Sequence, residues 1–343
     1  MSDWVASTPA PAPALRPRLN PVPVALFALL ALAPVFAALS GAEGYVLSLL
    51  TRVMIFGIAA LSLDLILGYG ALVSFGHAAF LGIGAYAVGI LASHGIEDAL
   101  IQVPVALLAS AAFALVTGAI SLRTKGVYFI MITLAFGQML FFLATSLAAY
   151  GGDDGLTLPA RSTLAGFALL RSDRALYAAT LLALLGVYAL CTAVVNSRFG
   201  RVLRGAKENA VRMEAIGFHP FGYQLVAYAL SGMIAGLAGC LLANQAEFVS
   251  PAFMTWQRSG ELIFMVILGG LASLHGAILG AAAFLLLEEF LPEILHTAAF
   301  LASDDVRARL AENWKMVFGP LLILVVLFVR GGIMGLLGQR HHG

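Results

Sequence analysis

Few polar side chains interrupt the apolar stretches of this chain. Those whose types could do chemistry include Asp64, His77, Thr133, Gln138, Glu261, Glu288 and Glu289. An ionisable group in a long apolar stretch marks a functional site by default, because burying it in hydrocarbon costs free energy. Arg258 and Glu261 stand three residues apart, a spacing that lets them pair on one helical face. The carboxylates are otherwise scattered, which disfavours a proton relay.

Patterns typical of enzymes and metal sites are missing from the sequence. His77 has no second His or carboxylate at the spacing of metal ligands, so no metal site is expected. The segment Gly151–Gly155 (GGDDG) lacks the lysine and the preceding strand of a phosphate loop, and we expect a polar turn there. We predict no cofactor and no catalytic residue. If nucleotide drives this protein, the ATPase is a separate polypeptide.

Small residues recur every three to four positions between Leu72 and Gly89 (LVSFGHAAFLGIGAYAVG). Such a stripe lets the backbones of membrane helices approach closely, and its alternative role is to line a transport path. His77, which follows the Gly68–Gly70 turn, is either a path residue or a capping or packing residue. The candidates for the translocation path or for helix packing are Ser74, His77, Gly82, Gly84, Thr133 and Gln138.

Composition sets the class of protein. The 343 residues are 61% hydrophobic and only 11% charged, whereas a soluble domain carries about 25% charged residues. The chain is therefore predicted to be an all-α polytopic membrane protein. Cys191 and Cys240 both lie in apolar stretches and offer no disulfide framework. The basic residues follow membrane topology, so nucleic acid is not an expected partner.

Ten stretches are long and apolar enough to be candidate membrane spans, each needing about 20 residues. They are Val22–Leu39, Tyr45–Leu67, Leu72–Ser93, Ile101–Leu122, Val127–Ala148, Ala175–Val195, Phe221–Ala243, Glu261–Leu279, Gly280–Phe300 and Trp314–Val329. Residues 1–21, rich in Ala and Pro, are predicted to be a disordered cytoplasmic tail. Residues 22–330 then form the transmembrane domain, and residues 331–343 form a second cytoplasmic tail.

A basic segment, Asn196–Pro220, separates the first five candidate spans from the last five. Each Arg at mid-bilayer costs roughly 2.5–3.5 kcal/mol, so this segment must lie in water, and its positive charge places it in the cytoplasm. Both termini are then cytoplasmic too, and an odd number of spans per half predicts two inverted five-helix halves. Apolar residues spaced by three to four predict an amphipathic helix over Arg198–Ile216, a docking surface for a cytoplasmic partner.

The chain resembles the inner-membrane permease subunits of bacterial branched-chain amino-acid ABC importers, the Liv M-type permeases. The resemblance covers nearly the whole chain after the N-terminal tail. It rests on six segments that occur in the order of the family: Gly68–Gly89, Leu122–Met139, Gly151–Leu156, Ser197–Phe218, Ser231–Ala243 and Glu261–Ala282.

The resemblance implies a subunit that forms half of a translocation path for branched-chain or related aliphatic amino acids. Its implied partners are a Liv H-type permease subunit, two cytoplasmic ATPase subunits, a periplasmic substrate-binding protein and membrane lipid. The stretch Arg198–Gly217 matches the coupling segment of the family. The expected coupling residues are Arg198, Arg201, Arg204, Glu208, Ile216, Gly217 and Phe218.

Other functions remain open at this point. Related permeases of the family carry urea, short amides or aromatic acids. A stand-alone proton- or sodium-coupled transporter would need no ATPase but would need paired carboxylates at mid-membrane. A membrane-embedded enzyme would need a cluster of His and acidic residues, which the sequence lacks.

Overall fold

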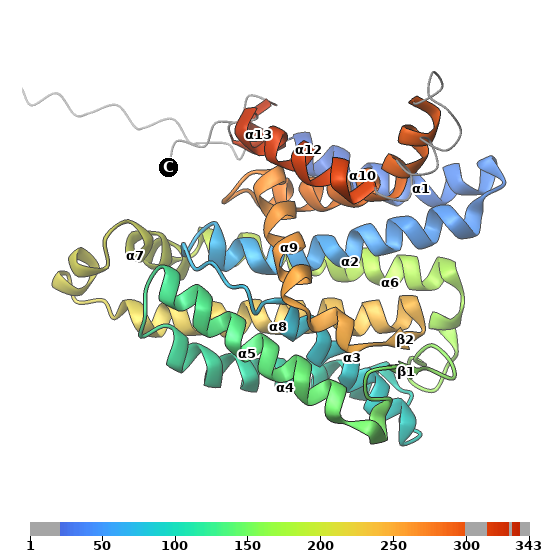
Figure 1. Ribbon diagram of the computed structural model, residues 1–343, viewed down its shortest axis with the longest axis horizontal. Coiled ribbons are helices and arrows are strands. Elements are labelled where there is room, and N and C mark those ends of the chain that lie inside the picture. The colour runs from blue at the N-terminus through green and yellow to red at the C-terminus, as the bar shows by residue number, and fades with distance from the viewer. Residues whose placement is uncertain (1–20, 299–313, 329–330, 337–343) are drawn as a thin grey trace, which may run out of the picture.

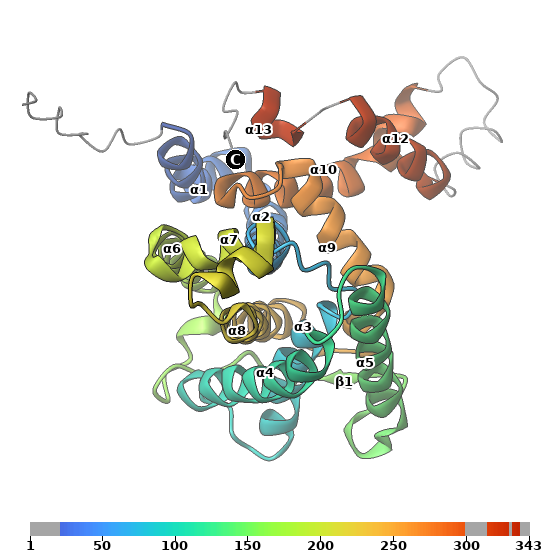
Figure 2. The ribbon, with the colours of Figure 1, turned by 90° about the vertical axis from the view of Figure 1, so that its left-hand side faces the viewer.

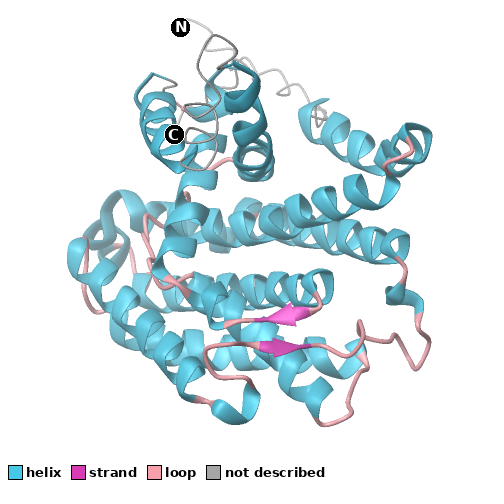
Figure 3. Ribbon diagram, turned by 45° about the vertical axis from the view of Figure 1, so that its right-hand side comes forward, coloured by secondary structure: helices cyan, strands magenta, loops and turns pink. Residues whose placement is uncertain are grey.

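Our computed structural model describes residues 21–298, 314–328 and 331–336, and in this part the chain is almost entirely helical (Figure 3). The α-helices are α1 (Pro21–Ser40), α2 (Glu43–Leu67), α3 (Ala78–Ser93), α4 (Ala99–Ser121), α5 (Val127–Ser146), α6 (Asp173–Asn196), α7 (Arg198–Ala215), α8 (Pro220–Ala246), α9 (Trp256–Gly269), α10 (Leu274–Ala298), α12 (Trp314–Phe328) and α13 (Gly332–Leu336). Three short 3-10 helices are η1 (Ala148–Tyr150), η2 (Leu169–Arg171) and η3 (Pro251–Met254). The strands β1 (Leu156–Thr157) and β2 (Phe248–Val249) form one antiparallel pair.

The described residues contain six helices that are long and apolar enough to cross a membrane: α2, α4, α5, α6, α8 and the Leu274–Ile294 part of α10. Two shorter apolar helical segments are Val22–Ala38 and Ala78–Ser93. These helices confirm an all-α, multi-pass membrane protein. The number of spans, ten, and the inverted symmetry of the halves stay predictions.

Two predicted span boundaries are wrong. The stretch Leu72–Ser93 is helical only from Ala78, because residues 71–77 form an irregular segment before α3. The stretch Glu261–Leu279 is not one helix but the end of α9, a turn and the start of α10. That turn contains two left-handed residues, Gly270 (φ +113°) and Ala272 (φ +59°), which end the helical hydrogen-bond pattern.

The helices lie in layers when the molecule is viewed from the end that carries α7 (Figure 2). Helices α1, α10 and α12 form one layer, α2 and α6 the next, α8 and α3 follow, and α4 lies beyond them. Helix α9 runs across these layers and contacts α10, α2, α3 and α5. Helix α2 is central, and its residues 53–66 are all buried. Because both faces of α2 are covered by other helices, its apolar residues show no amphipathic pattern.

The end of the molecule opposite α7 is closed by the connection between α5 and α6 (Figure 1). Leu156 and Thr157 pair with Val249 and Phe248 across β1 and β2. The Ser162 amide donates to Asn244 Oδ1 at 2.7 Å, and the Ser162 hydroxyl donates to Gln102 at 2.5 Å. These buried bonds fasten the long connection to α4 and α8.

The predicted tails are only partly described. Residues 1–20 of the N-terminal tail and 337–343 of the C-terminal tail lie outside the described residues, as do the last residues of the spans Gly280–Phe300 and Trp314–Val329. Within the C-terminal segment, α13 packs on α9 and α10, and Met334 is buried there.

Candidate functional site

Helix α7 forms where the sequence predicts a helix, and local bonds define both of its ends. The Ser197 hydroxyl accepts a hydrogen bond from the Gly200 amide at 3.3 Å, which caps the first turn. Asn209 has non-helical backbone angles that kink the helix, and its Oδ1 caps the second part through the Arg212 amide at 2.9 Å. At the end, Gly217 adopts a left-handed φ of +91°, and the Phe218 amide bonds to the Met213 carbonyl at 3.0 Å. This is the Schellman arrangement that favours Gly.

One face of α7 is buried and the other is charged and exposed. Its buried residues are Gly200, Val202, Leu203 and Ala206. The predicted coupling residues Arg198, Arg201, Arg204 and Glu208 are all exposed. Beyond the helix, Ile216 is 62% exposed and Phe218 37% exposed. Exposed apolar side chains rimmed by charged ones mark a surface for a protein partner.

The two parts of α7 enclose a groove of about 540 Å³ on this exposed surface. It is lined by Arg198, Arg201, Val202, Met213, Phe218 and Tyr223. The Phe218 and Tyr223 rings meet edge to face, with centroids 6.2 Å apart, and hold the wall of the groove. The groove therefore brings together three of the predicted coupling residues, Arg198, Arg201 and Phe218.

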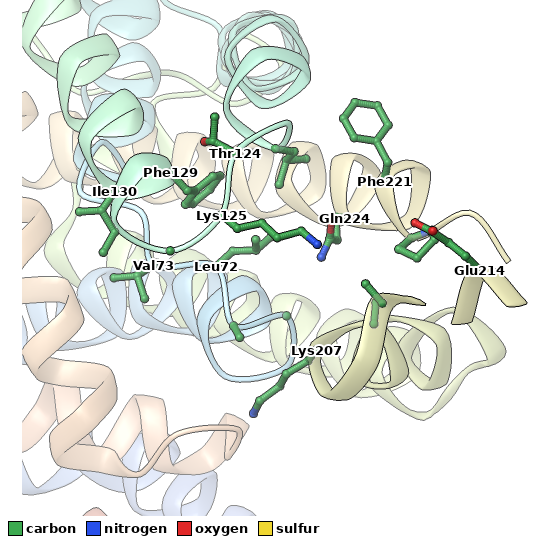
Figure 4. Close-up of a pocket in the computed structure, with 17 residues that line it drawn as sticks. Leu72, Val73, Thr124, Lys125, Phe129, Ile130, Lys207, Glu214, Phe221 and Gln224 are labelled. Atoms are coloured by element: carbon green, nitrogen blue, oxygen red, sulfur yellow. The ribbon is translucent and has the colours of Figure 1, made fainter. Parts of the chain in front are cut away.

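A second cavity, of about 440 Å³, lies beside the buried face of α7 (Figure 4). Its walls come from the segment after α2, the turn between α4 and α5, helix α7 and the start of α8. Its polar lining includes Thr124, Lys125, Lys207, Glu214 and Gln224. None of these five was among the predicted coupling or path residues, although Lys207 and Glu214 lie in the basic segment Asn196–Pro220.

The end of α2 brings Asp64, which the sequence indicated, together with Tyr69 and Lys207, whose contacts the sequence did not indicate. Lys207 of α7 donates to the Gly68 carbonyl at 2.8 Å. Asp64 Oδ1 accepts from the Ala272 amide at 2.9 Å, and the Tyr69 hydroxyl donates to the Ala272 carbonyl at 2.8 Å. Burial raises the pKa of Tyr69, so its hydroxyl stays protonated and can donate. An aspartate inside a span was the available signal, but nothing in the sequence names its partner.

His77 and Ser74 are fully buried in the irregular segment and its junction with α3. His77 Nε2 lies 2.8 Å from the Ser62 hydroxyl, which itself donates to the Ala59 carbonyl at 2.6 Å. Because Ser62 has one proton, Nε2 is the donor in this pair. The His77 side chain makes no capping bond to α3. It joins α2 to the start of α3.

Gly82 and Gly84 lie at close helix contacts. A Cβ atom at Gly82 would stand 2.0 Å from Met254 Cγ, and one at Gly84 would stand 1.9 Å from the Gly236 carbonyl oxygen. Thr133 is buried and donates to the Ile130 carbonyl at 2.9 Å, whereas Gln138 is half-buried on α5. The two glycines therefore have the geometry of packing positions.

The acidic side chains of Glu261, Glu288 and Glu289 each have a partner. Arg258 and Glu261 form the predicted i, i+3 ion pair at 2.5 Å. Glu288 lies 3.9 Å from Arg52, and Glu289 accepts from the Tyr45 hydroxyl at 2.9 Å. Within the described ranges, no group of three His, Cys, Asp or Glu side chains has the arrangement of a metal site.

Comparison with known proteins identifies the family of the chain. Residues 45–327 match the family model described as branched-chain amino acid transport system / permease component. The chain belongs to this permease family. The match begins in α2 and ends in α12, so the family covers both sides of α7.

Individual proteins that the chain resembles are also permease proteins by name. The high-affinity branched-chain amino acid transport system permease proteins LivM of Salmonella typhimurium and Escherichia coli are each 28% identical over 308 residues, which cover 83% of this chain and 68% of the relative. A probable branched-chain amino acid transport permease protein LivH of Methanocaldococcus jannaschii is 34% identical over 105 residues, covering 29% of this chain and 30% of the relative. No solved structure matches the chain.

Proposed function

We propose that this chain is a permease subunit of an ATP-driven importer and forms half of the translocation path for branched-chain or related aliphatic amino acids. The family match and the LivM relatives support this assignment. The chain itself provides a path and no chemistry. ATP hydrolysis takes place in a partner subunit and drives alternating access.

The proposal that an ATPase docks on this chain rests on one observation, the exposed surface of α7. It presents Arg198, Arg201 and Arg204 on the helix and the apolar side chains of Ile216 and Phe218 after it. A secondary transporter has no use for such a surface on an amphipathic segment between two long spans. We assign Arg198, Arg201, Arg204, Glu208, Ile216, Gly217 and Phe218 to ATPase contact.

The proposed complex has four kinds of partner. A LivH-type subunit completes the path, two ATPases dock at α7, a periplasmic protein delivers the amino acid, and lipid surrounds the spans. In this complex the chain lies in the bacterial inner membrane with α7 and both termini in the cytoplasm. Ten spans in two inverted halves of five fit this orientation, with residues 22–330 as the permease domain.

The interior of the subunit fits an aliphatic cargo. Small residues such as Gly82 and Gly84 bring the helices close. Ser74, His77, Thr133 and Gln138 are the polar residues that we assign to the path, and all four are buried or half-buried. The ion pairs on α9 and α10 leave no row of unpaired charges, among the described residues, for a strongly polar solute.

Uptake in membrane vesicles tests the proposal. Vesicles that contain this chain, its LivH-type partner and the binding protein should import radiolabelled leucine only when the ATPase subunits are co-expressed. Uptake without ATPase, abolished by a protonophore, would instead establish a secondary transporter. Competition by isoleucine and valine, but not by urea, acetamide or phenylalanine, should confirm the substrate class.

A further inference from the structure

The turn after α2 is bonded to two segments that are distant in the sequence. Gly68 accepts from Lys207 of α7, which lies 139 residues further along. Asp64 and Tyr69 bind the Ala272 amide and carbonyl, respectively, across 208 and 203 residues. Ala272 lies in the turn between α9 and α10. At this point helix α7, the end of the central helix α2 and the α9–α10 turn meet. We call these five residues the clamp: Asp64, Gly68, Tyr69, Lys207 and Ala272.

The clamp is rigid on the side of α9 and α10. Ala272 is held at both its N–H and its C=O, and its own φ of +59° is unusual for a residue with a side chain. A Cβ atom at Gly68 would stand 2.5 Å from the Ala272 nitrogen, so the two backbones are in direct contact. The α9–α10 turn and the end of α2 are therefore expected to move together.

Helix α7 reaches the clamp through the side chain of Lys207. Lys207 Nζ donates to the Gly68 carbonyl at 2.8 Å, and the Gly68 amide donates to the Asp64 carbonyl at 2.7 Å. The Asp64 side chain is fully buried and accepts from the Ala272 amide. A displacement of Lys207 therefore acts on Gly68 and, through the end of α2, on Ala272.

We propose that the clamp transmits ATPase-driven movement of α7 to α9 and α10, with Asp64, Tyr69 and Lys207 as positioning residues. This inference rests on the proposed function. At its other end α9 is tied to α3, because the Ala78 amide donates to the Ser259 hydroxyl at 3.0 Å. Helix α9 also forms a wall of a largely apolar cavity of about 610 Å³ that Phe75, Glu261 and Phe284 help to line. Movement of α9 changes the shape of this cavity.

The test is the ratio of ATP hydrolysed to leucine imported, measured in proteoliposomes that contain the complete complex. The variant Lys207→Met should assemble in normal amounts and raise this ratio about five-fold, because loss of one hydrogen bond changes a conformational equilibrium by roughly that factor. Lys207→Arg retains a donor for the Gly68 carbonyl and should restore the normal ratio. Tyr69→Phe, which removes only a hydroxyl, should raise the ratio in the same direction.

Matched controls distinguish a loss of motion transfer from a loss of protein stability and from the removal of a positive charge. Lys125→Met removes a lysine that lines the same 440 Å³ cavity from the α4–α5 turn, and it should leave the ratio unchanged. If Lys207 has a merely structural role, Lys207→Met will lower ATP hydrolysis and leucine import in parallel, and this result would overturn the proposal. An equal rise of the ATP-to-leucine ratio in Lys125→Met would also overturn it. If Lys207→Met fails to assemble, an unchanged ratio for Tyr69→Phe decides against the clamp. Wild-type vesicles test the proposed function separately, through the ATP dependence of uptake itself.

Discussion

Gly84 on α3 lies directly against the backbone of Gly236 on α8, so that a Cβ atom at residue 84 would stand 1.9 Å from the Gly236 carbonyl oxygen. The backbone of α8 cannot yield as a flexible side chain can. Gly84→Ala should therefore separate α3 from α8 and destabilise the protein by about 1–3 kcal/mol. Thermal unfolding in detergent measures the effect.

Gly186→Ala is the matched control, because a Cβ atom there meets nothing within 4 Å on the exposed side of α6. That variant should unfold at the wild-type temperature or slightly above it, since Ala favours the helix. Equal unfolding temperatures for the two variants would mean that α3 and α8 do not pack at these glycines.

Ile216 is the apolar side chain, among the residues that we assign to ATPase contact, whose change should disrupt ATPase docking most clearly. Ile216→Asp places a charge that the ATPase must desolvate, while the 62% exposed position leaves the fold intact. The protein should insert and purify normally, whereas ATP hydrolysis stimulated by substrate and uptake should fall together by at least about ten-fold. Ile216→Leu retains the contact and should behave as wild type. Normal uptake by Ile216→Asp would place the ATPase elsewhere.

Asn244 fastens the α5–α6 connection to α8. Its Oδ1 accepts from the Ser162 amide and its Nδ2 donates to the Cys240 carbonyl at 2.9 Å. Asn244→Leu loses both bonds and should weaken the attachment by about 1–3 kcal/mol. We expect faster tryptic cleavage after Arg161 in right-side-out vesicles.

Gln245→Leu changes the neighbouring residue, whose side chain donates to the exposed Ser48 hydroxyl, and should leave the cleavage rate unchanged. Cleavage at the wild-type rate in Asn244→Leu vesicles would show that the other contacts, among them the Ser162–Gln102 bond and the β1–β2 pair, hold the connection without Asn244.

Val211 offers a direct test of membrane orientation. It is 73% exposed on α7, so Val211→Cys should react readily with a membrane-impermeant maleimide. The native thiols of Cys191 and Cys240 are buried and provide a low background. Labelling is expected in inverted vesicles and not in intact spheroplasts. The opposite pattern would reverse the orientation of the whole chain.

The sequence predicts those features that depend on local pattern. Helix α7 was expected over Arg198–Ile216 and occupies Arg198–Ala215, because charge density and apolar spacing are both encoded within the segment. The pairing of Arg258 with Glu261 likewise follows from their spacing on one helix.

Features that depend on distant contacts could not be predicted. Hydropathy gives no sign that residues 71–77 leave the helix, where a Cβ atom at Gly76 would stand 2.1 Å from the Thr133 carbonyl oxygen. The roles of Asp64 and Tyr69 depend on Ala272, more than 200 residues away. The Gly269–Gly270 pair indicates the end of α9, but apolar residues on both sides of it favour one continuous span in a hydropathy reading.

The most direct test of the account is leucine uptake by proteoliposomes that contain the purified complex, ATP on the ATPase side and no ion gradient. Uptake against a concentration gradient should proceed in the presence of protonophore and sodium ionophore. It should stop when the ATPase carries a substitution that blocks hydrolysis. Uptake that persists with the inactive ATPase, or that requires an ion gradient, would contradict the assignment of this chain as an ATP-driven permease subunit.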